Sequence, residues 1–193
     1  ARLEQQRAEA LLDSYTAQRR LTHEFTNHIS ALEGLLQQGI ELVILGSGES
    51  QYENFFNELA ARNPGRVGVY IGFNAKLAQH IYAGADIFLM PSRSEPCGLA
   101  QMVSCRYGTI PVIRETGGLK DSIHDSGDGY GNGFTFANYN AHELYEACWR
   151  AKEGYWQKDG WPILVKRAME CDFSWSNSAK SYEGLYNEVV NLW

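Results

Sequence analysis

The sequence predicts an α/β fold in which a parallel sheet of about five to six strands has helices on both faces, with a long helix in front of it. From residue 40 onward, short apolar runs alternate with helix-like segments, which is the pattern of repeated βαβ units. Such units join parallel strands through right-handed crossovers. Residues 1–38 differ from the rest, since they contain no proline and only one glycine, Gly34.

The N-terminal segment, residues 1–38, is predicted to form one amphipathic helix. Its apolar side chains, among them Leu11, Phe25, Leu32 and Leu36, recur at helical spacing, while arginine, glutamate and glutamine fill most other positions. An apolar face of this length needs a partner, which is either the rest of the domain or a second copy of the chain.

Residues 39–193 are predicted to form one α/β domain. The expected strands are apolar runs bounded by turn signals, at 41–45, 67–71, 87–90, 109–113 and 133–136. The expected helices lie between and after them, at 52–61, 74–83, 97–107, 119–123, 141–151, 161–170 and 176–190. Pro111 suggests an irregular or edge strand, because proline has no N–H for the ladder. Residues 126–133 contain four glycines and are expected to form a mobile loop.

The composition argues against several classes of protein. An apolar fraction of 44% is enough for a core, and a net charge of −6 without a basic run argues against a nucleic-acid partner. The four cysteines form no C-x-x-C pair, so we expect reduced thiols and neither a disulfide framework nor a metal site. With no membrane-length apolar run and no secretory signal, the expected location is the cytoplasm, away from a membrane.

The strongest functional signal is the segment 91–101, which follows the expected strand at 87–90. Ligands of open α/β sheets bind at the carboxyl ends of the strands, and this segment places Glu95 and Gly98 there. A carboxylate in this position can accept hydrogen bonds from sugar hydroxyls or stabilise positive charge at an anomeric carbon. The competing interpretation is a solvated loop acid. Cys97 has no histidine near it in sequence, so a packing role is favoured over a nucleophile.

Two glycine-containing turns follow other strands. Gly46 and Gly48 lack the full G-x-G-x-x-G spacing, so they fit either a tight turn or a close approach of ligand, and a nicotinamide dinucleotide is not supported. Thr116, Gly117 and Gly118 follow the fourth expected strand, where two glycines let backbone amides point at a phosphate. A Gly-Gly pair also serves ordinary turns, but its place one βα unit after segment 91–101 favours a shared polar, anionic ligand.

From about residue 35 onward the chain resembles the C-terminal half of bacterial glycogen synthase and plant starch synthase, which are glycosyltransferases of the GT-B fold. The matching sequence motifs occur in family order over most of the chain, at 42–49, 70–73, 83–86, 91–99, 107–111, 114–121 and 172–175. The motif at 92–99, Ser-Arg-Ser-Glu-Pro-Cys-Gly-Leu, is highly specific for this family.

This resemblance implies a Rossmann-like domain and a retaining transfer of glucose to the non-reducing end of an α-1,4-glucan. The implied donor is ADP-glucose, or sometimes UDP-glucose, and neither a cofactor nor a metal is expected. Glu95 would hold the hydroxyls of the donor glucose, as the candidate catalytic residue. Phe73 would lie near the nucleotide base, where the family often has tyrosine, and phenylalanine keeps the stacking face without the hydroxyl.

The implied donor-binding residues are Gly46, Gly48, Phe73, Glu95, Cys97, Gly98, Leu99, Thr116, Gly117 and Gly118. Among them, the backbone at 97–99 would line the sugar, and Thr116 and Gly117 would contact the diphosphate.

The sequence departs from the family in one respect that bears on activity. The family's active site lies between two Rossmann-like domains, and the sequence resembles only the second. The acceptor site and an Arg–Lys pair that neutralises the donor phosphates belong to the unmatched part, and Arg19, Arg20 and His23 occupy the region before residue 42 in a different context. The expected partner is therefore an N-terminal GT-B domain, and these residues alone are expected to be inactive.

Residues 1–38 resemble another family, the dimerisation and phosphoacceptor helix of sensor histidine kinases. The family's His-Asp/Glu-Phe-x-Asn-His motif occurs at 23–28. It implies His23 as a phosphoacceptor, Glu24 as its proton acceptor, and a homodimer formed through the helix. The competing interpretation is a plain amphipathic helix. Beside the donor-binding half of a transferase, two functions stay open: a dimerising signalling module and a non-catalytic nucleotide-binding domain.

Overall fold

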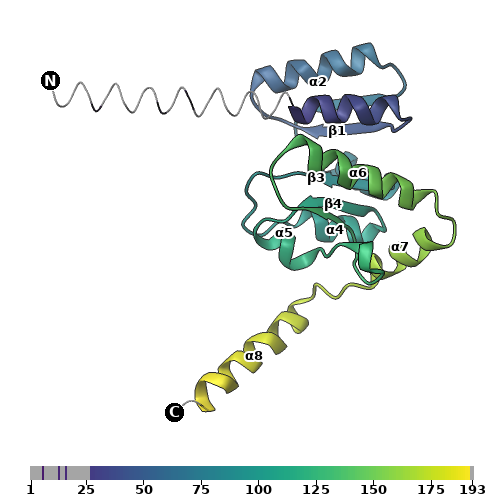
Figure 1. The fold of residues 1–193 in the computed structure, drawn as a ribbon. Coiled ribbons are helices and arrows are strands. Elements are labelled where there is room, and N and C mark those ends of the chain that lie inside the picture. Colours follow the sequence, from purple (N-terminus) through teal and green to yellow (C-terminus); the bar gives the residue numbers. More distant parts are fainter. Residues whose placement is uncertain (1–5, 7–12, 14–15, 17–26, 192–193) are drawn as a thin grey trace. The chain divides into compact units, whose positions relative to one another are not determined.

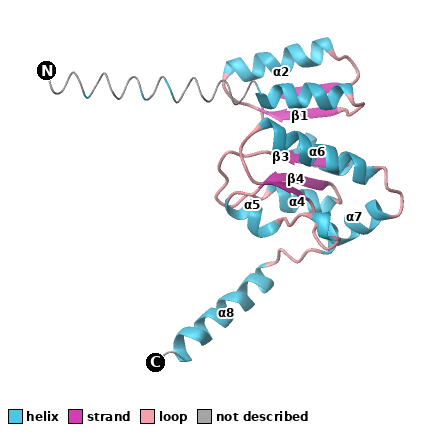
Figure 2. Ribbon diagram, viewed as in Figure 1, coloured by secondary structure: helices cyan, strands magenta, loops and turns pink. Residues whose placement is uncertain are grey.

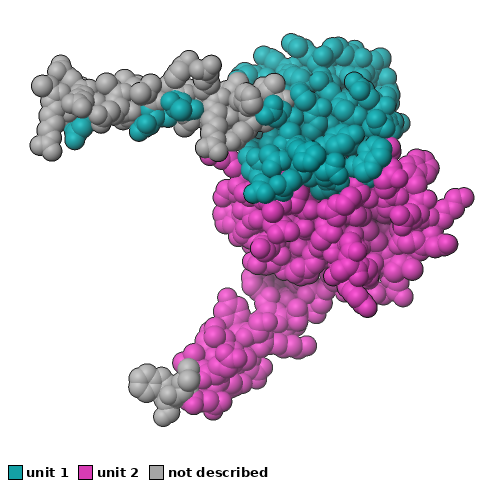
Figure 3. Space-filling view, viewed as in Figure 1, with its two compact units in different colours: residues 1–75, 138–149 teal, residues 76–137, 150–193 magenta. Residues whose placement is uncertain are grey.

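The computed structural model describes residues 6, 13, 16 and 27–191, and the chain divides into two compact units (Figure 3). Unit 1 comprises residues 1–75 and 138–149, and unit 2 comprises residues 76–137 and 150–193. The order of helices and strands along the chain can be followed in Figure 1.

The strands confirm the predicted α/β class with parallel pairing (Figure 2). In unit 1, β1 (Leu42–Gly46) pairs with β2 (Val67–Ile71). In unit 2, β4 (Ile110–Arg114) lies between β3 (Ile87–Met90) and β5 (Phe134–Phe136). The described residues thus contain five strands in two hydrogen-bonded sheets, where the sequence indicated five to six in one.

Helices occupy the intervals that the sequence assigned to them. They are residues 27–37, α2 (Ser50–Arg62), α3 (Ala75–Gly84), α4 (Ala100–Tyr107), α5 (Gly117–Ser122), α6 (Ala141–Tyr155), α7 (Gly160–Glu170) and α8 (Trp175–Asn191), with a 3₁₀ turn at Ser126–Asp128. Within the described ranges, none of these helices combines the length and apolar character needed to cross a membrane.

The core of unit 1 lies between its sheet and two helices. Leu36 from residues 27–37 and Leu59 from α2 are buried with Val67 of β2, and Phe55 and Phe56 pack against this cluster. Burying such side chains is the main favourable contribution to folding. For the described part of the N-terminal segment, the apolar face therefore has its partner within unit 1.

Arg66 closes the carboxyl end of helix 27–37. Its guanidinium donates to the carbonyl oxygen of Leu36 and, at 2.9 Å, to that of Ile40. The Leu36 carbonyl also accepts from the N–H of Gly39 at 3.1 Å, so Arg66 adds a second donor to a carbonyl at the end of the helix and connects it to Ile40.

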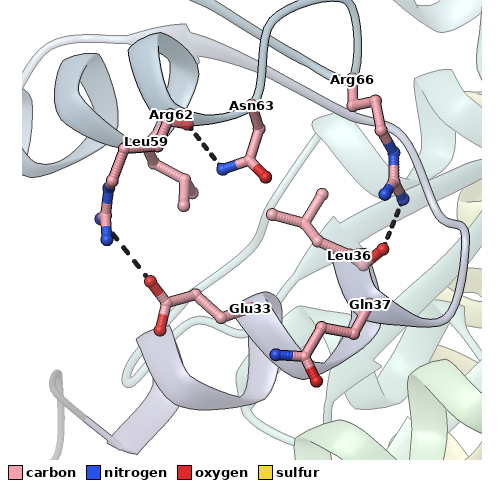
Figure 4. A pocket seen from close by; sticks show the side chains of 7 residues that line it. All are labelled: Glu33, Leu36, Gln37, Leu59, Arg62, Asn63 and Arg66. Atoms are coloured by element: carbon pink, nitrogen blue, oxygen red, sulfur yellow. Dashed lines mark hydrogen bonds and ion pairs between the residues drawn. The ribbon is translucent and has the colours of Figure 1, made fainter.

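A surface cavity of about 360 Å³ lies between helix 27–37 and α2 (Figure 4). Across it, Arg62 forms a 3.6 Å ion pair with Glu33, and the Asn63 amide donates to the Leu59 carbonyl at 2.9 Å. The lining contains none of the candidate site residues predicted from the sequence. Arg62 pairs with Glu33, and Asn63 and Arg66 donate to the backbone carbonyls of Leu59 and Leu36, so we interpret the cavity as a gap between two packed helices.

Pro111 lies in the central strand of the three described in unit 2, so of the two predicted alternatives, an irregular or an edge position, the edge position is wrong. The N–H of Ile110 donates to Asp86 on the β3 side, and successive residues of a strand face opposite neighbours. The nitrogen of Pro111 therefore faces the β5 side, where the register with β5 begins only at Val112, opposite Phe134. Pro111 therefore lacks its N–H at a position just before the β4–β5 hydrogen bonds begin.

The segment 126–133 is held by several hydrogen bonds, whereas its glycine content predicted a mobile loop. The carboxylate of Asp128 accepts from the N–H groups of Tyr130 and Gly131 at 2.7 and 3.0 Å, which holds its pKa below the usual range. The N–H of Ser126 donates to the Gly133 carbonyl at 2.8 Å. Local acceptors thus fix a backbone that its glycines leave intrinsically free.

Candidate functional site

Two loops of unit 2 leave the sheet at neighbouring strands. The first loop, residues 91–99, follows β3 and leads into α4. The second loop, residues 115–118, follows β4 and includes the first two residues of α5. Since β3 and β4 are parallel and directly paired, their carboxyl ends lie at the same edge of the sheet. This edge is where open α/β sheets bind ligands.

The two loops are in direct backbone contact through Gly117 and Gly118. A Cβ on Gly117 would overlap the carbonyl oxygen of Glu95 and lie 3.0 Å from its carbonyl carbon. A Cβ on Gly118 would overlap the carbonyl oxygen of Cys97 and lie 2.8 Å from its Cα. The Gly118 N–H also donates to the Pro96 carbonyl at 3.2 Å. The Gly-Gly pair is therefore required by close packing of one loop against the other.

Gly98 turns the first loop into α4 with a φ of 71°, in the left-handed region that favours glycine. The space that its Cβ would occupy is already filled, with Gln101 Oε1 at 2.6 Å and Leu119 Cδ2 at 2.9 Å. Leu119 comes from α5, so this helix also packs against the first loop.

Two polar groups of the loops are left for a ligand. Within residues 27–191, the half-buried carboxylate of Glu95 has no hydrogen bond or ion pair, and the N–H of the exposed Gly117 has no acceptor. The N–H of Gly118, by contrast, is already used by Pro96. The sequence indicated the amides of both Gly117 and Gly118 as phosphate donors. In the structure, the Gly117 N–H is the one of the two that has no acceptor among the described residues.

The remaining predicted residues of these loops surround the same two groups in sequence. Cys97 and Leu99 are exposed and Thr116 is half-buried. In α4, burial raises the pKa of the Cys105 thiol to about 12, so this cysteine stays protonated at neutral pH. Within the described part of the chain, no three His, Cys, Asp or Glu side chains gather into a metal site.

The other predicted donor-site residues belong to unit 1. Gly46 ends β1 and accepts from Gly72 N–H at 2.8 Å, and the N–H of Gly48 donates to the Glu53 carboxylate at 2.8 Å. Phe73 follows β2 with 92% of its surface exposed. These residues lie at or just after the carboxyl ends of their own strands. The proposed phosphoacceptor His23 lies outside the described residues.

A network that sequence reasoning missed supports the second loop. Glu115, next to Thr116, accepts from the Thr135 hydroxyl at 2.7 Å, and the Thr135 N–H donates to Asp125 at 2.8 Å. Arg150 donates to Asp125 at 2.8 and 2.9 Å and to the Thr135 carbonyl at 2.8 Å. Burial raises the pKa of Asp125, but the N–H groups of Thr135 and of the nearby glycine, together with Arg150, outweigh it and hold that pKa below the usual range.

Comparisons with known proteins identify the family of the chain. The family model described as glycosyl transferases group 1 matches residues 15–155, a range that includes part of the N-terminal segment. The chain is 50% identical over 158 residues to a glycogen synthase of Bacillus cereus, covering 81% of this chain and 33% of that protein. It is 49% identical over 162 residues to a glycogen synthase of Desulforudis audaxviator, covering 82% and 32%.

Among solved structures, the chain is similar to the catalytic domain of starch synthase IV from Arabidopsis thaliana bound to ADP and acarbose, with a TM-score of 0.73 and 36% identity. That similarity covers 84% of this chain and 35% of the other. The chain spans about a third of the length of the curated relatives it matches. It belongs to the glycosyl transferases group 1 family, in which it resembles the C-terminal region of glycogen and starch synthases.

Proposed function

We propose that this chain supplies the donor-binding half of a retaining glucosyltransferase of the glycogen and starch synthase type, with ADP-glucose as donor and an α-1,4-glucan as acceptor. Under this proposal residues 39–193 form the nucleotide-sugar-binding domain, and an N-terminal GT-B domain is its partner. We place the reaction in the cytoplasm, as the cysteine pattern of the sequence indicates.

One observation carries the proposal: the loops after β3 and β4 are in backbone contact and present the Glu95 carboxylate and the Gly117 N–H, which have no partner among the described residues. A carboxylate suits sugar hydroxyls and the positive charge that develops at the anomeric carbon. A backbone N–H suits a phosphate oxygen. A sugar diphosphate has both kinds of group next to each other, and the similar starch synthase IV was solved with ADP bound.

The proposal is tested by titrating the chain with ADP and ADP-glucose in a calorimeter. The Glu95→Gln variant should bind ADP as the unchanged chain does but bind ADP-glucose about tenfold or more weakly, because only the latter has glucose hydroxyls for the carboxylate. Asp121→Asn, which neutralises an exposed carboxylate on α5, should change neither affinity. Equal loss of both ligands in Glu95→Gln, or no binding at millimolar ADP, would contradict the assignment.

A polypeptide limited to these residues is expected to bind the donor without transferring glucose. In the family, the acceptor site and the cations that neutralise the donor phosphates come from the part that the chain does not match. Electrostatic stabilisation in a closed site is a large part of such catalysis. Elongation of glycogen from labelled ADP-glucose by the purified chain would overturn this expectation. A phosphoacceptor role of His23 and a homodimer through residues 1–38 stay separate predictions of the sequence.

Phe73 is proposed to stack on the nucleobase. The Phe73→Ala variant should weaken ADP binding by about tenfold, because stacking of a base on an aromatic ring is worth roughly 1–3 kcal/mol. The ring is 92% exposed, so its loss should leave the free energy of unfolding unchanged. Tyr130→Ala is a matched control, since that ring is 86% exposed and belongs to the segment 126–133. Equal ADP affinity in both variants would contradict a role for Phe73.

A further inference from the structure

Gln101 is a fully buried polar side chain beneath the two loops. It is the second residue of α4 and has no exposed surface. Its amide nitrogen donates to the carbonyl oxygen of Gly98 at 3.0 Å and to the Ser122 hydroxyl at 3.0 Å. Ser122, at the end of α5, in turn donates to the Gly118 carbonyl at 2.7 Å. One amide group is therefore bonded directly to the first loop and, through one hydroxyl, to the start of α5.

This arrangement is costly for a residue whose only task is to fill space. Burying an amide is unfavourable unless its groups are hydrogen-bonded, and within the described residues Gln101 Oε1 is buried without a partner. An apolar side chain of similar volume would avoid that cost. Gln101 supplies two N–H donors, which an apolar side chain cannot do. These donors connect the first loop to Ser122 and, through it, to the second loop.

We propose that Gln101, acting with Ser122, is a positioning residue that holds the loop at 91–99 against the start of α5, so that Glu95 and the Gly117 N–H are presented together. The choice of ADP-glucose as the ligand rests on the proposed function. The coupling between the two loops is independent of it. The Gly118 N–H bond to the Pro96 carbonyl reports this coupling directly, because it joins the two loops.

The test compares three single variants of the whole chain and the double variant Gln101→Met/Ser122→Ala. Gln101→Met keeps the volume and removes both donors, and Ser122→Ala removes the relay from a half-buried position. Ser104→Ala is the matched control: Ser104 is also buried on α4, and its hydroxyl donates to the backbone carbonyl of Gln101 at 2.8 Å, which is part of the helix and of neither loop. If Gln101→Met does not fold, Ser122→Ala carries the test alone.

The first measurement is amide hydrogen exchange of Gly118 in the ligand-free chain. Gln101→Met and Ser122→Ala should accelerate it about tenfold, while Ser104→Ala should not. The double variant should show no further acceleration, because both residues act through one relay. Unchanged Gly118 exchange in both Gln101→Met and Ser122→Ala would overturn the inference, and so would an equal acceleration in Ser104→Ala.

The second measurement is affinity for ADP-glucose, which should fall about tenfold in Gln101→Met and Ser122→Ala and stay constant in Ser104→Ala. If the unchanged chain binds no ADP-glucose while exchange responds as expected, the coupling is supported and the proposed function is wrong. If binding is present but all three variants weaken it equally, the loss reflects general destabilisation and the positioning role is overturned.

Discussion

Replacing Gly117 with alanine is expected to lower the free energy of unfolding of unit 2 by about 3 kcal/mol, the sum of backbone strain and a steric overlap. The φ of Gly117 is 45°, in the left-handed region that alanine enters at a cost. The new Cβ would also overlap the carbonyl oxygen of Glu95, which belongs to backbone and cannot rotate away. The loops must then separate.

Two comparison variants divide this effect into its parts. Gly118→Ala should be about 1 kcal/mol less destabilising than Gly117→Ala, because Gly118 has no left-handed φ and only the overlap with Cys97 remains. Gly184→Ala in α8 is the control, since a Cβ there meets nothing within 4 Å and alanine favours a helix. Urea unfolding followed by intrinsic fluorescence measures all three.

The same variants test whether contact between the loops matters for the ligand. Gly117→Ala should weaken ADP binding about tenfold or more, because it moves the N–H that is proposed to meet the diphosphate. Gly184→Ala should bind as the unchanged chain does. Unchanged unfolding and unchanged binding in Gly117→Ala would show that the loops are not packed together in solution.

The elements were predictable because their signals are local. The apolar runs of β2 and β3 lie between turn residues, and their observed bounds, Val67–Ile71 and Ile87–Met90, equal those expected. The helix expected at 97–107 begins only at Ala100, since Gly98 takes a left-handed φ. Pro111 was misjudged because its effect depends on which neighbour its nitrogen faces, and that is a property of the assembled sheet.

The candidate site was predictable in part. Glu95 and Gly117 could be chosen from sequence, because each follows an apolar run at a strand's carboxyl end. The contacts that hold them are tertiary and have no sequence period. Gln101 and Ser122 are 21 residues apart in sequence, and nothing in their spacing indicates the hydrogen bond. Likewise, only the structure shows that the Gly118 amide is already bonded to Pro96.

Neutralising Asp125 is expected to remove part of the acid sensitivity of unit 2. Its carboxylate accepts from the N–H groups of Gly127 and Thr135 and from Arg150, and Thr135 is buried. Asp125→Asn keeps the shape but cannot replace all these acceptors. Charged hydrogen bonds contribute roughly 1.5–3 kcal/mol, and since 33% of the side chain is exposed we expect a loss of about 2 kcal/mol at pH 7.

The sign of the pH dependence follows from the lowered pKa of Asp125. A carboxyl whose pKa is lower in the folded state stabilises the fold fully above its unfolded pKa, about 3.9, and this contribution is lost as the pH falls through the folded pKa. The difference in unfolding free energy between the unchanged chain and Asp125→Asn should therefore be constant from about pH 5 to 7 and narrow below pH 4.

Urea unfolding at a series of pH values measures this difference, with Asp121→Asn as the exposed control that should follow the unchanged chain throughout. Asp128 and Asp172, whose pKa values are also held low by hydrogen bonds, keep some acid sensitivity in every variant. A difference that stays constant down to pH 2 would mean that the Asp125 carboxylate is not the group whose protonation is coupled to folding. Thr135 joins Asp125 to Glu115, the neighbour of Thr116. In the pH range where the difference in unfolding free energy narrows, the unchanged chain should therefore also bind ADP more weakly.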